Sequence, residues 1–140
     1  MKLVIAEKPS VGMSIASVLK ADKKCGGYVS GNGYIVSWCV GHLIELADAE
    51  SYSEEYQVKP WQVESLPILP KQWKFKVIKE TSGQYKILKT LMDNPDITEI
   101  ICATDAGREG ECIFRYVYKL CKCRKPVKRL WISSVEENDI

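Results

Sequence analysis

The stretch IICATDAGREGECIF, residues 100–114, decides the fold. Its first four residues are apolar without a break, which is typical of a strand buried on both faces of a parallel sheet. After an acidic, glycine-containing turn, an apolar stripe follows at helical spacing: Ile113, Phe114, Val117, Tyr118 and Cys121. The stretch therefore predicts a strand, a tight turn and a helix.

The amino end, MKLVIAEKPSVG, repeats this order. Residues 3–6 are again continuously apolar, Glu7 follows them, and Pro9 stands where proline is favoured, at the first helical position. Ligands in such folds bind beyond the carboxyl ends of the strands. If the two strands are neighbours, Glu7, Asp105 and Glu109 converge on one crevice.

The rest of the chain completes an open α/β pattern. Residues 28–30 and 34–40 flank the turn-rich triplet 31–33, which indicates a hairpin. Strands are expected at 73–78 and 127–132, and a helix around 87–92 ends before Asn94 and Pro95. Residues 47–72 lack clear periodicity and form a long excursion or lid. We expect one domain over residues 1–140, with a mostly parallel sheet flanked by helices.

Composition is that of an ordinary globular protein. Of the 140 residues, 46% are hydrophobic and 27% charged, and a net charge of +2 neither supports nor excludes a DNA partner. The six cysteines show no paired CxxC spacing, so reduced thiols are expected rather than a zinc site. The apolar amino end is too short for a signal peptide or a membrane span, which favours a cytoplasmic protein without membrane attachment.

Carboxylates gathered at strand ends repel one another unless a cation lies among them. Oxygen-only ligands favour Mg²⁺ over a soft metal, and the chain has a single histidine, His42, interpreted as a structural hydrogen-bonding residue. The phosphate-binding patterns GxGxxG and GxxxxGK[ST] are absent, so no nucleotide cofactor is expected. Carboxylates with Mg²⁺ indicate phosphate chemistry.

Four segments carry a family resemblance: MKLVIAEKPSVG, YIVSWCVGHLIEL, ATDAGREGECIFR and RLWISS. In this order they resemble the toprim domain of type IA DNA topoisomerases, most of all the bacterial topoisomerase III group, over nearly the whole chain. The resemblance implies a Rossmann-like toprim fold. It also implies ATP-independent cleavage of a single DNA strand through a 5′-phosphotyrosine, passage of another strand, and Mg²⁺-dependent resealing.

The resemblance also implies roles for single residues. Glu7 matches the glutamate that lies near the scissile phosphate and handles the proton on the 3′-oxygen, and it is also expected among the metal ligands. Asp105 and Glu109 match the first and last acids of the DxDxE metal motif. Lys8 matches the lysine that holds the scissile phosphate, and Arg108, inside the acidic motif, is expected to pair with a carboxylate or to contact DNA.

The middle acid of that motif is replaced by Gly107. One carboxylate fewer predicts weaker metal binding. Glu111, four residues further on, lies on the same side of a helical turn as Gly107 and is the expected substitute ligand.

No tyrosine lies in a setting typical of a nucleophile, so we expect it in a downstream domain. The chain would then be the N-terminal part of a larger enzyme, inactive by itself. Two alternatives remain: a self-contained toprim nuclease or primase-type module, and, with poorer support, a receiver-like signalling module. Tryptophans in strand-like runs are usually core residues, so none is assigned to DNA: Trp38, Trp61, Trp73 and Trp131.

Overall fold

The computed structural model describes residues 1–57, 62–134, 136 and 138–140. These residues form eight strands: β1 Lys2–Ala6, β2 Lys23–Cys25, β3 Tyr28–Gly31, β4 Tyr34–Trp38, β5 Ile44–Leu46, β6 Phe75–Val77, β7 Glu99–Ala103 and β8 Val127–Arg129. The α-helices are α1 Pro9–Val18, α2 Ser82–Asp93 and α3 Arg108–Leu120. Short 3₁₀ turns are η1 Ala49–Ser51, η2 Glu54–Tyr56, η3 Val63–Ser65 and η4 Lys79–Thr81.

Strand β1 occupies the middle of a six-stranded sheet with the order β2-β3-β4-β1-β7-β8. It pairs in parallel with β4 on one side and with β7 on the other, so that Ala6 lies opposite both Trp38 and Ala103. The chain thus moves outward from β1 in both directions, and ligands of doubly wound sheets bind at such a switch point. The predicted α/β fold with a mostly parallel sheet is confirmed.

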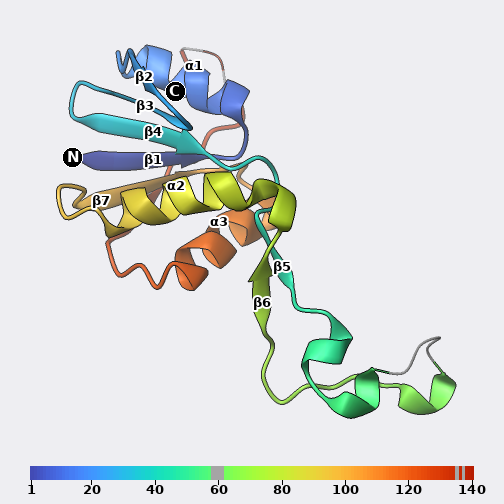
Figure 1. Cartoon of the computed structure of the whole chain (residues 1–140). Coiled ribbons are helices and arrows are strands. Elements are labelled where there is room, and N and C mark those ends of the chain that lie inside the picture. The colour runs from blue at the N-terminus through green and yellow to red at the C-terminus, as the bar shows by residue number, and fades with distance from the viewer. Residues whose placement is uncertain (58–61, 135, 137) are drawn as a thin grey trace.

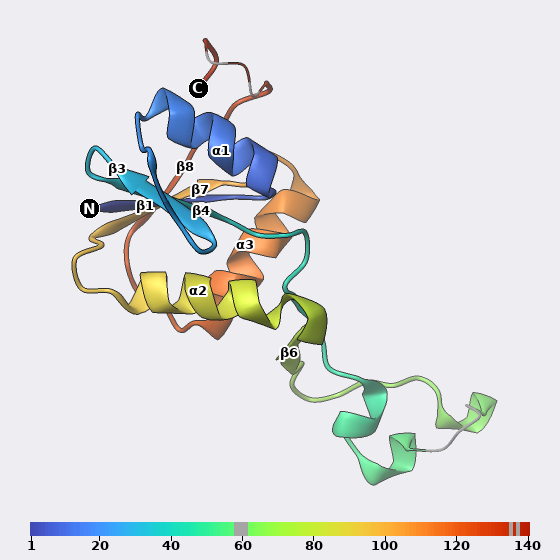
Figure 2. The same cartoon turned by 45° about the horizontal axis from the view of Figure 1, so that its top comes forward.

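Helices cover both faces of the sheet (Figures 1 and 2). Helices α2 and α3 pack on one face, where Leu3, Ile5, Leu88 and Phe114 belong to one buried cluster. Helix α1 packs on the other face, where Ile15 lies in a second cluster with β-strand residues. The continuous apolar run of β1 follows from this arrangement, because successive side chains of a strand point to opposite faces and both faces are covered.

The predicted hairpin is present as β3 and β4, which pair antiparallel. Its two-residue loop has positive φ at both positions, 48° at Asn32 and 81° at Gly33. That backbone is a type I′ turn, whose twist matches the strands and which asparagine and glycine favour. The turn therefore fixes the register that brings β4 beside β1.

Residues 44–77 form an arm that projects from the body (Figure 1). Its base is the antiparallel pair of β5 and β6, a separate two-stranded sheet. The expected strand at 73–78 therefore exists in shorter form but does not join the main sheet. Within the arm, Tyr52 and Trp73 meet edge to face with ring centroids 6.1 Å apart. The predicted excursion at 47–72 is this arm, of which residues 58–61 lie outside the described part.

Several other expectations can now be compared with the structure. The helix ending at Asn94 and the strands at both ends of the chain are confirmed, although β8 is shorter than expected and the short β2 and β5 were not anticipated. The assignment of tryptophans to the core holds for Trp38 but is wrong for Trp73 and Trp131, which are exposed. Trp61 lies outside the described residues. All six cysteines are free. No helix in the described part is long and apolar enough to cross a membrane.

Leu88 tests the packing of α2 on the sheet, because its side chain is fully buried in the larger core. We expect Leu88→Ala to lower the free energy of unfolding by about 2–5 kcal/mol, since transfer and cavity terms add. Lys86→Ala, an exposed position on the same helix, should change it by less than about 0.5 kcal/mol. Urea denaturation followed by circular dichroism measures both, and equal effects of the two substitutions would contradict this packing.

Candidate functional site

Glu7 stands directly after β1, where the buried strand ends, and is only 8% exposed. Its Oε2 accepts a hydrogen bond from the backbone N–H of Asp105 at 3.2 Å. On the other side of β1, Cys39 is fully buried, and burial raises the pKa of its thiol to about 12, with smaller contributions from Cys102 and Glu7. The predicted meeting of the two strand ends is confirmed, with the Glu7 carboxylate in a largely dry environment.

The first turn of α3 lies directly against the Asp105 loop. A Cβ added at Gly110 would lie 2.8 Å from Asp105 N and closer still to its carbonyl oxygen. Gly107 has an extended φ of −146° and is the N-cap residue of α3, and a Cβ there would meet nothing within 4 Å. The two glycines thus differ: the one at 110 permits a close approach, while the one at 107 leaves open space.

Glu111 is held by two arginines. Arg115 Nε donates to its Oε1 at 2.6 Å, and Arg129 Nη2 donates to its Oε2. These bonds, that from Arg115 first, lower the pKa of the Glu111 carboxyl below its ordinary value. Arg129 Nη1 also donates to the carbonyl oxygen of buried Thr104 at 2.5 Å.

The network ties α3 and β8 to the residue just before Asp105. Both carboxylate oxygens of Glu111 are thus engaged, and the structure does not support Glu111 as the substitute metal ligand. Its observed neighbours make it a residue that positions the loop. A cation bound by Glu111 would lie beside two guanidinium groups, whose positive charge opposes it.

The remaining predicted residues lie on the rim of the site. Glu109 points toward His42, with Oε1 3.5 Å from Nε2, and the Glu109 side chain is 78% exposed. Lys8 is exposed at the N-cap of α1, and Arg108 is exposed at the start of α3. The four acids proposed as ligands are therefore not gathered into one cluster. Glu7 contacts the Asp105 backbone, whereas the other two acids pair elsewhere.

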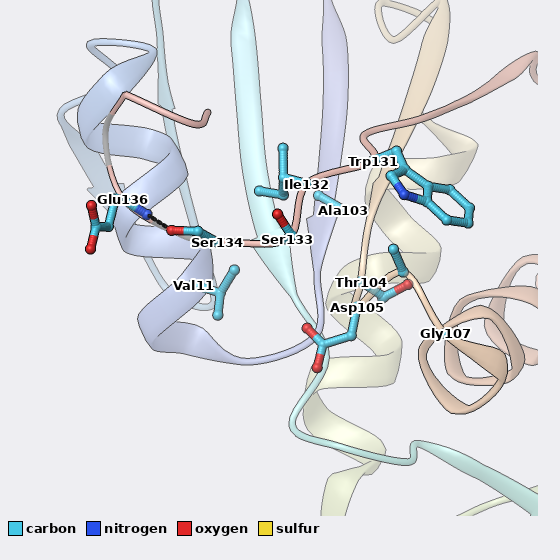
Figure 3. A pocket seen from close by; sticks show the side chains of 11 residues that line it. Val11, Ala103, Thr104, Asp105, Gly107, Trp131, Ile132, Ser133, Ser134 and Glu136 are labelled. Carbon is cyan, nitrogen blue, oxygen red and sulfur yellow. Dashed lines mark hydrogen bonds between the residues drawn. The ribbon is translucent and has the colours of Figure 1, made fainter.

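Beside this junction is a pocket of about 770 Å³. In Figure 3 the Asp105 carboxylate lies at its lower edge, and Val11 of α1 and Trp131 lie on opposite sides. Thr104, Ser133, Ser134 and Glu136 also belong to its polar lining. The pocket thus joins two acidic side chains to hydroxyl groups and one open indole ring.

Which metal these groups suit follows from their chemistry. Among residues 1–57, 62–134, 136 and 138–140, no three His, Cys, Asp or Glu side chains form a metal-binding group. The Glu7 and Asp105 carboxylates supply hard oxygen donors without a thiol or imidazole. Mg²⁺ keeps several waters and is usually bound through one or two carboxylates plus substrate phosphates. The donor set fits Mg²⁺ completed by water and phosphate better than an ion enclosed by protein.

Comparison with known proteins identifies the family. The Toprim domain model matches residues 2–135. The chain belongs to the Toprim domain family. Over 138 residues this Toprim domain is 53% identical to DNA topoisomerase 3 of Bacillus cereus and 49% identical to that of Bacillus subtilis. Each alignment covers 99% of the chain but 19% of the relative, so the Toprim domain spans about a fifth of the length of these proteins.

A solved structure supports the fold independently. Full-length topoisomerase I from Thermotoga maritima superposes with a TM-score of 0.58 and 22% sequence identity. The match covers 98% of this chain and 19% of the other. At this identity the likeness concerns the fold alone, and it agrees with the α/β architecture described above.

Three features of the site were not anticipated from the sequence. They are the role of Arg129 in holding the loop, the exposure of Trp131, and the serines at 133 and 134 in the pocket. A signal for them existed, because RLWISS begins at the last residue of β8. Since β8 is parallel to β7, residues that follow it belong to the same edge of the sheet as Asp105.

Gly107→Asp should restore a third carboxylate at the site. The extended backbone and open space at this position accept the side chain without strain, and hard divalent ions bind more tightly as ligand charge rises. We expect about tenfold tighter Mg²⁺ binding, roughly 1.4 kcal/mol, by calorimetry. Gly107→Asn keeps the size and the helix cap without the charge and should not show this gain.

Glu111→Gln is the companion to that measurement. Because Glu111 is paired with arginines, its replacement should leave Mg²⁺ affinity within about twofold of the original. In free energy this is a small fraction of the roughly 1.4 kcal/mol that a tenfold change represents. The opposite pattern, with no gain from Gly107→Asp and loss of binding in Glu111→Gln, would show that Glu111 already occupies the ligand position.

The same substitution predicts a pH dependence of stability. A carboxyl whose pKa is lowered by folding stabilises the protein above its unfolded pKa, and this contribution is lost as pH falls through the folded value. At neutral pH the free energy of unfolding of the original protein should exceed that of Glu111→Gln by about 1 kcal/mol. The difference is small because the Glu111 side chain is 39% exposed and solvent screens its ion pairs. As pH falls below the ordinary carboxyl range and through the lowered folded pKa, the difference should shrink progressively.

Urea denaturation at a series of pH values measures this difference. Glu80→Gln, at an exposed carboxylate without an ion pair to any described residue, is the control. A difference between the original and Glu111→Gln that stayed constant from neutral pH to pH 3 would contradict the ionic role of Glu111.

Proposed function

We propose that the chain is the metal-binding part of a type IA, topoisomerase III-like enzyme, which breaks, passes and rejoins single DNA strands with Mg²⁺. The observation that carries the proposal is the Glu7 carboxylate on the Asp105 backbone, at the carboxyl ends of two adjacent parallel strands. Identity of about half to proteins named DNA topoisomerase 3 supports this reading over other Toprim activities.

Mg²⁺ would be held by the Asp105 and Glu7 carboxylates, with Glu109 available from the rim. When bound, the ion neutralises phosphate charge and stabilises the oxygens that attack and leave. Glu109 is mostly solvent-exposed, so its carboxylate is free to turn from His42 toward a cation. Glu111, with both oxygens on arginines, is assigned to the support of the loop instead.

Glu7 would move the proton. Strand cleavage releases a 3′-oxygen that needs a proton, and resealing requires the same proton to be removed, so one carboxyl group serves both directions as general acid and base. Glu7 is suited to this task because it is buried but follows β1 at the carboxyl edge of the sheet, where the DNA strand would bind. Lys8, the adjacent residue, would hold the scissile phosphate, and Arg108 would contact the DNA backbone.

The nucleophilic tyrosine would come from a part of the enzyme outside this chain. Two tyrosines of the body have structural settings: Tyr118 donates to the Lys125 carbonyl, and burial raises the pKa of Tyr85 to about 12. A raised pKa makes the phenolate, the attacking form, harder to reach. The proposal accordingly needs no nucleotide and no covalent chemistry from these residues.

A chimera tests the proposal. The matching 138 residues of Bacillus cereus DNA topoisomerase 3 would be replaced by this chain, and relaxation of negatively supercoiled DNA measured with Mg²⁺. We expect relaxation by the chimera and a loss of at least about a hundredfold in Glu7→Gln and Asp105→Asn, since acid–base and metal contributions are removed. Asp96→Asn, exposed before β7 at the opposite edge, should retain activity.

The 140-residue chain alone separates this function from its main alternative. It should form no covalent adduct with DNA, because the nucleophile is missing. If the chain alone hydrolyses single-stranded DNA with Mg²⁺, and Asp105→Asn abolishes this, a self-contained nuclease replaces the topoisomerase proposal. An inactive chimera that is folded and binds Mg²⁺ would also overturn it.

A further inference from the structure

Trp131 is 76% exposed although it lies next to the site. Trp131 lines two hollows, the pocket that contains Asp105 and a second one of about 470 Å³. Figure 3 shows the ring extending from the segment after β8, on the side of the pocket that faces the Gly107 loop. One exposed indole is thus shared by the acidic pocket and a neighbouring hollow.

The second hollow has the chemistry of an aromatic-ring site with a cationic border. Its lining consists of Ala106, Gly107, Arg108, Glu111, Arg129 and Trp131. Arg129 is occupied by Thr104 and Glu111, whereas Arg108 is exposed and forms no ion pair with any residue that the structure describes. An added Cβ at Gly107 would meet nothing within 4 Å, so this part of the lining is open.

These observations favour a flat, uncharged ring attached to an anionic group. A nucleobase stacks on an indole face in a sequence-tolerant way, and an arginine beside it binds the neighbouring phosphate. The other described tryptophan with an open ring, Trp73, lies on the arm instead and meets Tyr52 edge to face. Only Trp131, of these two, adjoins the carboxylate at which phosphate chemistry is proposed.

We propose that Trp131 is a stacking platform for one base of the bound DNA strand and that Arg108 holds the adjoining phosphate. This inference rests on the proposed function. Trp131 and Gly107 line both hollows and Asp105 lines one of them, so a base stacked on the indole would set which phosphate of the strand lies at the acids. Trp131 is therefore a DNA-binding residue that positions the strand, without a part in the chemistry.

Fluorescence anisotropy with a labelled single-stranded oligonucleotide tests the platform. Trp131→Ala should weaken binding roughly five- to hundredfold, as expected for the loss of stacking with one base. Trp131→Phe keeps an aromatic face and should bind within about threefold of the original. Trp73→Ala is the matched control, because it also removes an exposed tryptophan but lies on the arm, and it should bind like the original.

A second oligonucleotide of equal length, with abasic sugars in place of bases, isolates the stacking. The original chain should bind it more weakly than the base-bearing strand, and Trp131→Ala should bind it as the original does. If Trp131→Ala fails to fold, the two strands on the unmodified protein still test the inference, because equal binding of both would exclude a stacked base.

Two results would overturn the inference in different ways. Equal binding of the base-bearing strand by the original and Trp131→Ala would exclude stacking on this ring while leaving the proposed function intact. No binding of either oligonucleotide by the original would remove the DNA-binding part of the proposed function, and the platform with it.

Discussion

The pairing of β1 with β7 is the constraint on which the site depends. Ala6 and Ala103 lie opposite each other in parallel strands, so the segments that follow β1 and β7 leave the sheet at the same edge and at the same level. Glu7 can then reach the Asp105 N–H although 98 positions separate the two residues in the chain. A shift of one residue in this register would turn every side chain of the strand to the other face. Burial on both faces of the sheet opposes such a shift.

Two local features keep the acidic loop where that pairing delivers it. Gly110 lets the first turn of α3 rest on the Asp105 backbone, and Arg129 bonds both to Thr104 and to Glu111. An acid in the first turn of a helix is also stabilised by the positive end of the helix dipole. The loop is therefore fixed by backbone contact and by charge, and its exposed carboxylates remain adjustable at the rim.

The sequence predicted the fold well because the apolar runs of β1 and β7 and the stripe of α3 are unambiguous patterns. It also predicted that Glu7 and Asp105 would meet, since both follow buried parallel strands. What it could not predict depends on partners distant in the chain. The pairing of Glu111 with Arg129 joins α3 to β8, and spacing within α3 alone suggested a metal ligand instead. Likewise, strand-like surroundings indicated a buried Trp131, but β8 ends at Arg129 and the ring follows in an exposed segment.

The arm differs from the body in how little of it is packed into the core. None of the described residues between 47 and 74 belongs to either buried cluster, and the arm meets the body at its base through Ile44, Phe75 and Val77. Because the cost of closing a loop rises only slowly with its length, insertions and deletions in this segment should be tolerated by the Toprim fold. The arm is thus the part of the chain where related proteins can diverge in length and surface without disturbing the pairing of β1 with β7.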